Sequence, residues 1–203
     1  MSFAGLLFSP TQILELLATV IGLVSVALLA RGDGRGWPVG AIWAALSIWL
    51  YLLSGIYGQA ALSLYFLAAQ FVGWRRWWKG EERDLREVSR TLSLQGRVRL
   101  GLGWLAGTAL LALALDLGAS RFPALDAFAT VGSLIGQALM VVGVAEAWPV
   151  YLLADLVLVA LSLRADMWFY AAMYVIYCGL AWQGWRGWTR DQSGERETAH
   201  LET

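Results

Sequence analysis

The chain has 203 residues, of which 59% are hydrophobic and only 15% are charged, and its mean hydropathy is +0.59. Soluble domains carry roughly 25% charged residues, so the composition excludes an ordinary water-soluble enzyme or a disordered chain and indicates a polytopic membrane protein. The 15 basic and 15 acidic side chains balance, which argues against a nucleic-acid binder acting through bulk charge. The single cysteine, Cys178, excludes an intramolecular disulfide framework and a zinc site built from cysteines.

Seven apolar stretches are long enough to cross a bilayer. A hydrocarbon core of about 30 Å needs roughly 20 apolar residues per helix, because backbone groups left unpaired in lipid are costly. The sequence therefore predicts an all-α protein with seven transmembrane helices, at residues 12–30, 37–54, 60–78, 100–117, 126–144, 148–163 and 167–185. Pro38 and Pro149 each follow a tryptophan at a predicted helix start, where the missing N–H of proline costs nothing.

Basic residues are sorted to one side of the membrane if the seven helices alternate in direction. Only Arg121 and Arg164 fall on the opposite side. The positive-inside rule then puts the N-terminus outside and the C-terminus in the cytoplasm. The charged segment 79–99 is expected to be a cytoplasmic linker, either solvated or partly folded as an amphipathic helix at the interface. Residues after Arg190 are expected to form a disordered tail.

An internal repeat becomes visible when the sequence is aligned with itself at a separation of 111 residues. Matching segments then coincide without a gap: Trp37-Pro38-Val39 with Trp148-Pro149-Val150, Gly73-Trp74-Arg75 with Gly184-Trp185-Arg186, Ala18-Thr19-Val20 with Ala129-Thr130-Val131, and Glu15 with Asp126. The separation predicts two parallel three-helix repeats joined by one connecting helix, a 3+1+3 plan. The predicted units are residues 1–78 for the first repeat, 79–99 for the linker, 100–117 for the connecting helix, 118–188 for the second repeat and 189–203 for the tail.

Asp155 is the sharpest candidate for a functional residue. It lies near the middle of the sixth predicted helix with no Lys or Arg within a helical turn. Polar groups in hydrocarbon are costly, so the carboxylate is expected to meet a cationic or hydrogen-bonding substrate. The alternative is a neutral aspartic acid bonded to a neighbouring helix.

Aromatic and amide side chains surround this position in the sequence. Trp148 and Tyr151 share a helical face with Asp155, and Tyr174 and Tyr177 belong to a stripe on the seventh predicted helix. Aromatic faces attract cations and stack on planar rings, so a planar cationic ligand suits this set; the alternative for the aromatic side chains is helix packing and an interfacial belt. The amides in the predicted spans, Gln70 and Gln137, could read a polar edge of the ligand or join helices.

The remaining charged positions complete the predicted site. Glu15 and Asp126 occupy matching outer helix ends and are interpreted as gate or rim residues. No nucleophile–base pair, phosphate-binding loop or metal-ligand cluster is recognisable, so neither an enzyme nor a cofactor is predicted.

The chain resembles the PnuC-type vitamin transporters. The resemblance rests on the 3+1+3 plan, the run Ala68-Ala69-Gln70-Phe71-Val72-Gly73-Trp74, the pair Trp148 and Tyr151, and Gly184-Trp185-Arg186. It implies an architecture similar to that of the SWEET sugar transporters, residence in the inner membrane, a homotrimer, and facilitated diffusion of a non-phosphorylated vitamin. A cytoplasmic kinase would then trap the vitamin as its phosphate. Nicotinamide riboside is the usual substrate, and relatives carry thiamine or riboflavin.

The sequence departs from the nicotinamide riboside pattern at the expected site. Where that pattern has Trp-x-x-Trp followed by Asn, this chain has Trp148, Tyr151 and Asp155, and Ser63 and Gln70 replace a Gln and an Asn. Nicotinamide riboside and thiamine both carry a cationic ring that suits Asp155, and the family favours the former. A sugar carrier or a non-transporting membrane scaffold are further alternatives. The predicted substrate-binding residues are Asp155, Trp148, Tyr151, Gln70, Tyr174, Tyr177, Ser63 and Trp43.

Overall fold

A computed structural model describes residues 10–53, 57–78, 90–116, 122–164 and 168–201. These ranges contain seven helices and no β-strand element beyond one isolated bridge, which confirms the predicted fold class. The helices are α1 (Pro10–Ala30), α2 (Gly36–Leu53), α3 (Tyr57–Trp78), α4 (Leu94–Asp116), α5 (Pro123–Val141), α6 (Ala147–Arg164) and α7 (Trp168–Leu201).

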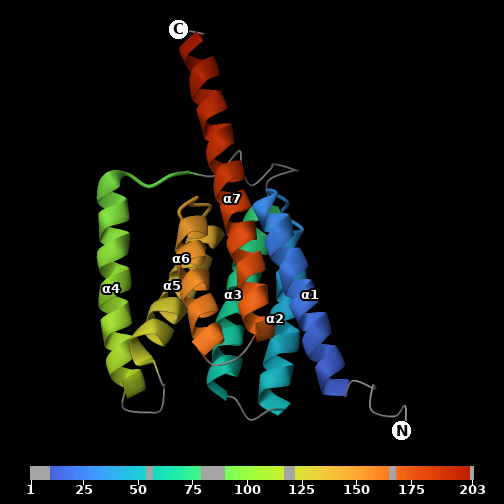
Figure 1. Cartoon of the computed structure of the whole chain (residues 1–203). Helices are drawn as coiled ribbons and strands as arrows, with labels where there is room; N and C mark the ends of the chain where they lie inside the picture. Colours follow the sequence, from blue (N-terminus) through green and yellow to red (C-terminus); the bar gives the residue numbers. More distant parts are fainter. Residues whose placement is uncertain (1–9, 54–56, 79–89, 117–121, 165–167, 202–203) are drawn as a thin grey trace.

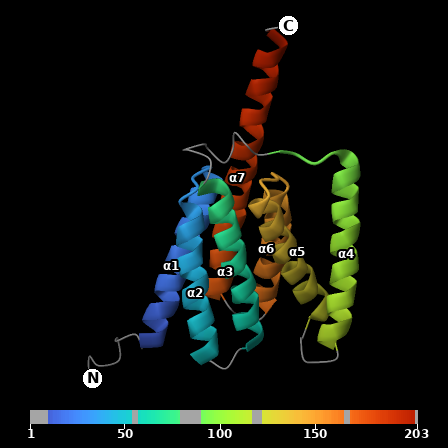
Figure 2. The same ribbon diagram turned by 180° about the vertical axis from the view of Figure 1, so that it is seen from behind.

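Five of these helices, α1, α2, α4, α5 and α6, are long and apolar enough to cross a membrane. The two others carry more polar residues: α3 ends on Arg75 and Arg76, and α7 continues into a charged segment. Both nevertheless run alongside the spanning helices, as Figures 1 and 2 show from opposite sides.

Six helices form a closed ring, and α4 stands outside it. Helix α2 packs between α1 and α3, and α6 packs between α5 and α7; the two triplets meet where α1 contacts α7 and where α3 contacts α5. Helix α4 packs against α5 alone among the described elements (Figure 1). Trp104 anchors it, because its ring stacks on Phe128 at 4.4 Å between centroids and its Nε1 donates to the Phe128 carbonyl at 2.9 Å.

The repeat is visible in the backbone of two turns. Gly32 after α1 and Gly143 after α5, which are 111 positions apart, adopt φ values of 79° and 72°, a region that glycine enters without steric cost. Their N–H groups donate to equivalent carbonyls, of Leu29 at 3.0 Å and of Met140 at 3.1 Å. The two turns are therefore built alike, and the equivalent helices of the two triplets run in the same direction, which is the predicted parallel plan (Figure 1).

A buried tryptophan core closes one end of the ring. Trp37 and Trp148 begin α2 and α6 and are almost fully buried. Trp37 lies against Gly73 and Trp148 against Gly184, so closely that a Cβ on either glycine would overlap the indole ring. Trp188, also fully buried, packs edge-on against Trp148. We call this end of the molecule, at which α1, α3, α5 and the ring-forming part of α7 finish, the tryptophan end.

Two boundaries differ from those predicted by more than three residues. Helix α4 begins at Leu94 rather than at residue 100, because its first turns are polar and extend the helix beyond the apolar run. The expected disorder after Arg190 is wrong, because α7 continues to Leu201. Extending an existing helix requires no new nucleation, so a polar sequence that could not start a helix can continue one. The linker residues 79–89 lie outside the described ranges.

Candidate substrate site

Asp155 lies in the middle of α6 (Ala147–Arg164) and is half-buried. Its carboxylate interacts electrostatically with the hydroxyls of Tyr174 and Tyr177 on α7 and of Tyr151 on its own helix. Within the described ranges, no basic side chain forms an ion pair with it; the ion pairs there join Arg35 to Asp33 and Arg97 to Glu146. Among the described residues, the ring thus holds an acidic group that interacts with three phenols and has no cationic partner.

Aromatic side chains from three further helices extend this cluster. Trp43 on α2 packs against Phe66 on α3, with ring centroids 5.8 Å apart, and Tyr65 packs edge-on against Phe66 at 5.6 Å. A Cβ added to Gly22 on α1 would lie 3.0 Å from the Trp43 ring and 3.2 Å from the Tyr177 hydroxyl. The absence of a side chain at Gly22 therefore lets Trp43 and Tyr177 pack side by side against α1. Tyr177 also interacts electrostatically with Asp155, so it connects these aromatic side chains to the carboxylate.

Two buried amides lie on α3 and α5. The Tyr151 hydroxyl donates a hydrogen bond of 2.7 Å to Oε1 of Gln137 on α5. Gln70 on α3 packs against Gly40 of α2, where a Cβ would lie 2.6 Å from its amide. Both glutamines are only 5% exposed. Among the described residues, Oε1 of Gln70 and Nε2 of Gln137 have no hydrogen-bond partner.

The structure brings most of the predicted substrate-binding residues to this cluster, but Trp148 lies elsewhere. Trp148 is 1% exposed and is enclosed by Gly184 and Trp188 in the tryptophan end. Trp37 makes the equivalent contact in the first triplet, which identifies a packing role for both residues. Contact between Trp148 and a ligand stays a prediction. Ser63 is buried on α3, consistent with a position inside the bundle.

Sequence reasoning missed Tyr65 and Phe66. Phe66 stands 111 positions before Tyr177, so the repeat itself could have identified it. The Tyr65 hydroxyl donates to the Leu134 carbonyl at 2.9 Å, a contact between α3 and α5 that no local pattern predicts.

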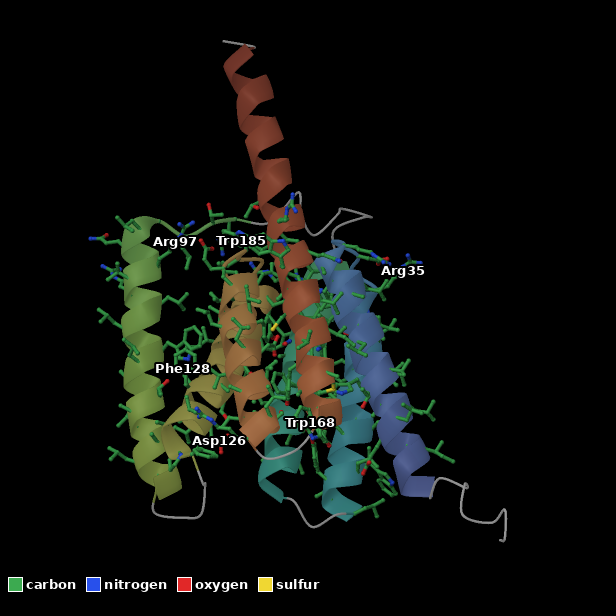
Figure 3. The ribbon with its side chains drawn as sticks, viewed as in Figure 1. Arg35, Arg97, Asp126, Phe128, Trp168 and Trp185 are labelled. Atoms are coloured by element: carbon green, nitrogen blue, oxygen red, sulfur yellow. The ribbon has the colours of Figure 1, made fainter. Side chains whose placement is uncertain are left out.

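The two predicted rim residues lie at the end opposite the tryptophan end. Glu15 is exposed near the start of α1 and interacts electrostatically with Tyr51. Asp126 lies in the first turn of α5, near the level of Trp168 at the start of α7 (Figure 3). A gating role for Glu15 and Asp126 stays a prediction.

The residues of the candidate site differ between the two repeats, whereas the residues that shape the scaffold are the same. Gly32 and Gly143, or Trp37 and Trp148, are identical in the two triplets. The repeat equivalents of Asp155, Tyr174, Tyr151 and Gln70 are instead Ala44, Ser63, Gly40 and Ala181. A symmetric ring with an asymmetric lining suits a ligand whose two ends differ chemically.

These features define a class: a polytopic helical membrane transporter with two parallel triplets and a polar aromatic site between them. The chain belongs to the family described as nicotinamide mononucleotide transporter, whose sequence profile matches residues 12–190. This confirms the resemblance to PnuC proteins. The chain is therefore a transporter and not an enzyme.

Individual relatives differ in the vitamin they are named for. The chain is similar to the nicotinamide riboside transporter PnuC of Neisseria mucosa, with 26% identity over 90% of this chain and 74% of the relative. It is similar to the riboflavin/roseoflavin transporter RibM of Streptomyces davaonensis, with 27% identity over 86% of this chain and 83% of that protein. The PnuC protein of Haemophilus influenzae is 23% identical over 90% of this chain and 81% of its own length.

A crystal structure of the vitamin B3 transporter PnuC has the same fold. Its TM-score with this chain is 0.71, at 24% sequence identity, and the match covers 91% of this chain and 83% of that one. This likeness supports the fold of the ring and does not identify its ligand.

Proposed function

We propose that the protein takes up nicotinamide riboside, a non-phosphorylated vitamin with a cationic ring, by facilitated diffusion. The observation that carries the proposal is Asp155, a carboxylate without a basic partner among the described residues, next to Tyr174 and Tyr177. A carboxylate attracts a pyridinium ion, and aromatic faces stack on its ring; a desolvated cation–π contact is worth about 2 kcal/mol. The two relatives named as PnuC transporters support the same ligand.

The distribution of charge favours the riboside over its phosphorylated form. The described basic residues of the ring lie toward its two ends, as in Arg75 and Arg76 in the last turn of α3 and Arg164 in the last turn of α6. A phosphate group would therefore approach Asp155 without a cation to offset the repulsion. A cytoplasmic kinase would phosphorylate the vitamin only after transport. The free vitamin would then stay at low concentration inside the cell, and its concentration gradient would continue to drive uptake.

The same charges support an orientation in the inner membrane. The tryptophan end carries Arg35 and Arg97 (Figure 3), together with Arg75 and Arg186. By the positive-inside rule this end faces the cytoplasm, which puts the N-terminus outside and the C-terminus inside. The resemblance to the family also favours a homotrimer.

Binding measurements on the purified protein test the ligand. We expect nicotinamide riboside to bind, nicotinamide mononucleotide to bind at least tenfold more weakly, and Asp155→Asn to weaken riboside binding by tenfold or more, about 1.4 kcal/mol. Asp33→Asn is the control, because Asp33 lies in the turn after α1 and pairs with Arg35. Unchanged riboside affinity in Asp155→Asn would remove Asp155 from the site.

The alternatives have distinct results in the same experiment. Thiamine binding without riboside binding would identify thiamine, rather than nicotinamide riboside, as the transported vitamin. Riboflavin is neutral, so its binding should be insensitive to Asp155→Asn; preference for it would align this chain with RibM. A scaffold would show no binding and no flux of any of the three vitamins into reconstituted vesicles.

A further inference from the structure

Helices α3 and α5 each carry a buried polar side-chain atom that has no partner among the described residues, at positions whose repeat equivalents are apolar. Gln70 Oε1 is an acceptor without a donor, and Gln137 Nε2 is a donor without an acceptor. Their repeat equivalents are Ala181 and Val26, which have no polar side-chain atoms. The scaffold of the ring therefore closes without amides, and the glutamines need a different explanation.

Leaving these atoms unpaired carries a free-energy cost. A buried polar group without a partner destabilises a protein by about 1–3 kcal/mol. Gln137 is held in place by the 2.7 Å bond that its Oε1 accepts from Tyr151, so its Nε2 is a fixed donor. A fixed donor without a partner is complementary to a ligand group that carries a hydrogen-bond acceptor.

We propose that Gln137 is a specificity-determining residue, whose Nε2 donates a hydrogen bond to a carbonyl oxygen on the planar ring of the transported vitamin. The inference rests on the proposed function and deepens it. In nicotinamide riboside this oxygen belongs to the carboxamide of the pyridinium ring. Tyr151 is a positioning residue for Gln137, in addition to any contact that its ring makes with the ligand.

A cycle of variants and ligands separates this role from packing. Gln137→Met removes the donor at similar volume, but it also leaves the Tyr151 hydroxyl without its acceptor. Tyr151→Phe removes that hydroxyl and keeps the ring. The comparison of Tyr151→Phe with the double variant Tyr151→Phe/Gln137→Met therefore isolates the amide. Gln183→Met, on the exposed surface of α7, is the matched control.

Two ligands complete the cycle: nicotinamide riboside and its analogue in which a methyl group replaces the carboxamide. In the Tyr151→Phe background Gln137 is no longer held by the tyrosine hydroxyl, so we expect Gln137→Met to weaken riboside binding by about threefold or more, and to change analogue binding by less than twofold. Equal losses for both ligands would assign Gln137 to packing and overturn the inference. So would an unchanged affinity for the riboside. If the unsubstituted protein binds neither the riboside, thiamine nor riboflavin, the proposed function itself fails, and that result is distinguishable from both others.

Discussion

Two tryptophans at equivalent repeat positions have different surroundings. Trp188 on α7 is fully buried, and its Nε1 donates to the Leu29 carbonyl of α1 at 3.1 Å. Trp77 occupies the same place on α3, but its buried Nε1 has no acceptor among the described residues. The contact between α1 and α7 thus has a hydrogen bond that the contact between α3 and α5 lacks.

Replacing each tryptophan by phenylalanine should reveal this difference. Both substitutions remove one ring, but only Trp188→Phe breaks a hydrogen bond, which is worth about 1 kcal/mol. We expect Trp188→Phe to lower the thermal unfolding midpoint in detergent more than Trp77→Phe does. The exposed Trp182 provides the control Trp182→Phe, which should change the midpoint least. A larger loss for Trp77→Phe would contradict the assigned asymmetry.

At the scale of elements, the turns after α1 and after α5 share a backbone conformation but make different side-chain contacts. The turn after α1 is fastened by Arg35, which pairs with Asp33 at 2.6 Å and is largely exposed. The hydrogen bonds from Arg35 hold the pKa of Asp33 below its ordinary value of 3.8, so the pair persists at neutral pH and is lost only on acidification through that lowered pKa. Exposure keeps its contribution to stability small.

The position equivalent to Arg35 in the second triplet is Glu146, which is 5% exposed. Its carboxylate accepts from the Leu92 N–H at 3.1 Å and from Arg97 Nε at 2.9 Å. Arg90 adds two backbone bonds of 2.9 Å, to Gly143 and from Ala145. The segment before α4 is therefore tied to the turn between α5 and α6, which explains how a helix outside the ring is held in place.

Glu146→Gln should test this attachment. The amide keeps one acceptor oxygen but loses the negative charge and the second acceptor that serve Arg97 and the Leu92 N–H, and hydrogen bonds to charged groups are worth about 1.5–3 kcal/mol. We expect a clear decrease in the unfolding midpoint, whereas Asp33→Asn in the equivalent exposed turn should change the free energy of unfolding by less than about 1 kcal/mol. Limited proteolysis near residues 90–93 supplies a second measurement, with faster cleavage expected in Glu146→Gln. Equal effects of the two substitutions would show that Glu146 does not fasten the segment.

The positive φ values of Gly143 and Gly32 lead to a separate prediction about stability. An alanine in the left-handed region costs about 1–2 kcal/mol, so Gly143→Ala and Gly32→Ala should each lower the unfolding midpoint. Gly34→Ala is the control, because a Cβ at Gly34 would lie in open space. A midpoint in either variant as high as that of Gly34→Ala would contradict the strain assigned to the turn.

At the scale of the whole molecule, the sequence was informative wherever structure is local or repeated. The lengths of the apolar runs predicted seven helices, and the matching Trp37 and Trp148 segments predicted the two triplets. The closure of the ring was not predictable, because it depends on packing between helices distant in the chain. For the same reason, the sequence does not reveal that Gly184 lets Trp148 pack into the core, or that Nε2 of Gln137 has no partner among the described residues.

The orientation of the ring in the membrane yields the last prediction. Glu15 and Arg35 are both exposed and lie at opposite ends of the bundle, close to the two ends of α1. In a Cys178→Ser background, we expect a membrane-impermeant maleimide to label Glu15→Cys in intact cells and Arg35→Cys only after the cells are opened. The reverse labelling pattern would show that the protein has the opposite orientation in the membrane. Because basic side chains near helix ends resist translocation, exchanging the arginines of the tryptophan end for glutamine should weaken this preference and produce both labelling patterns together.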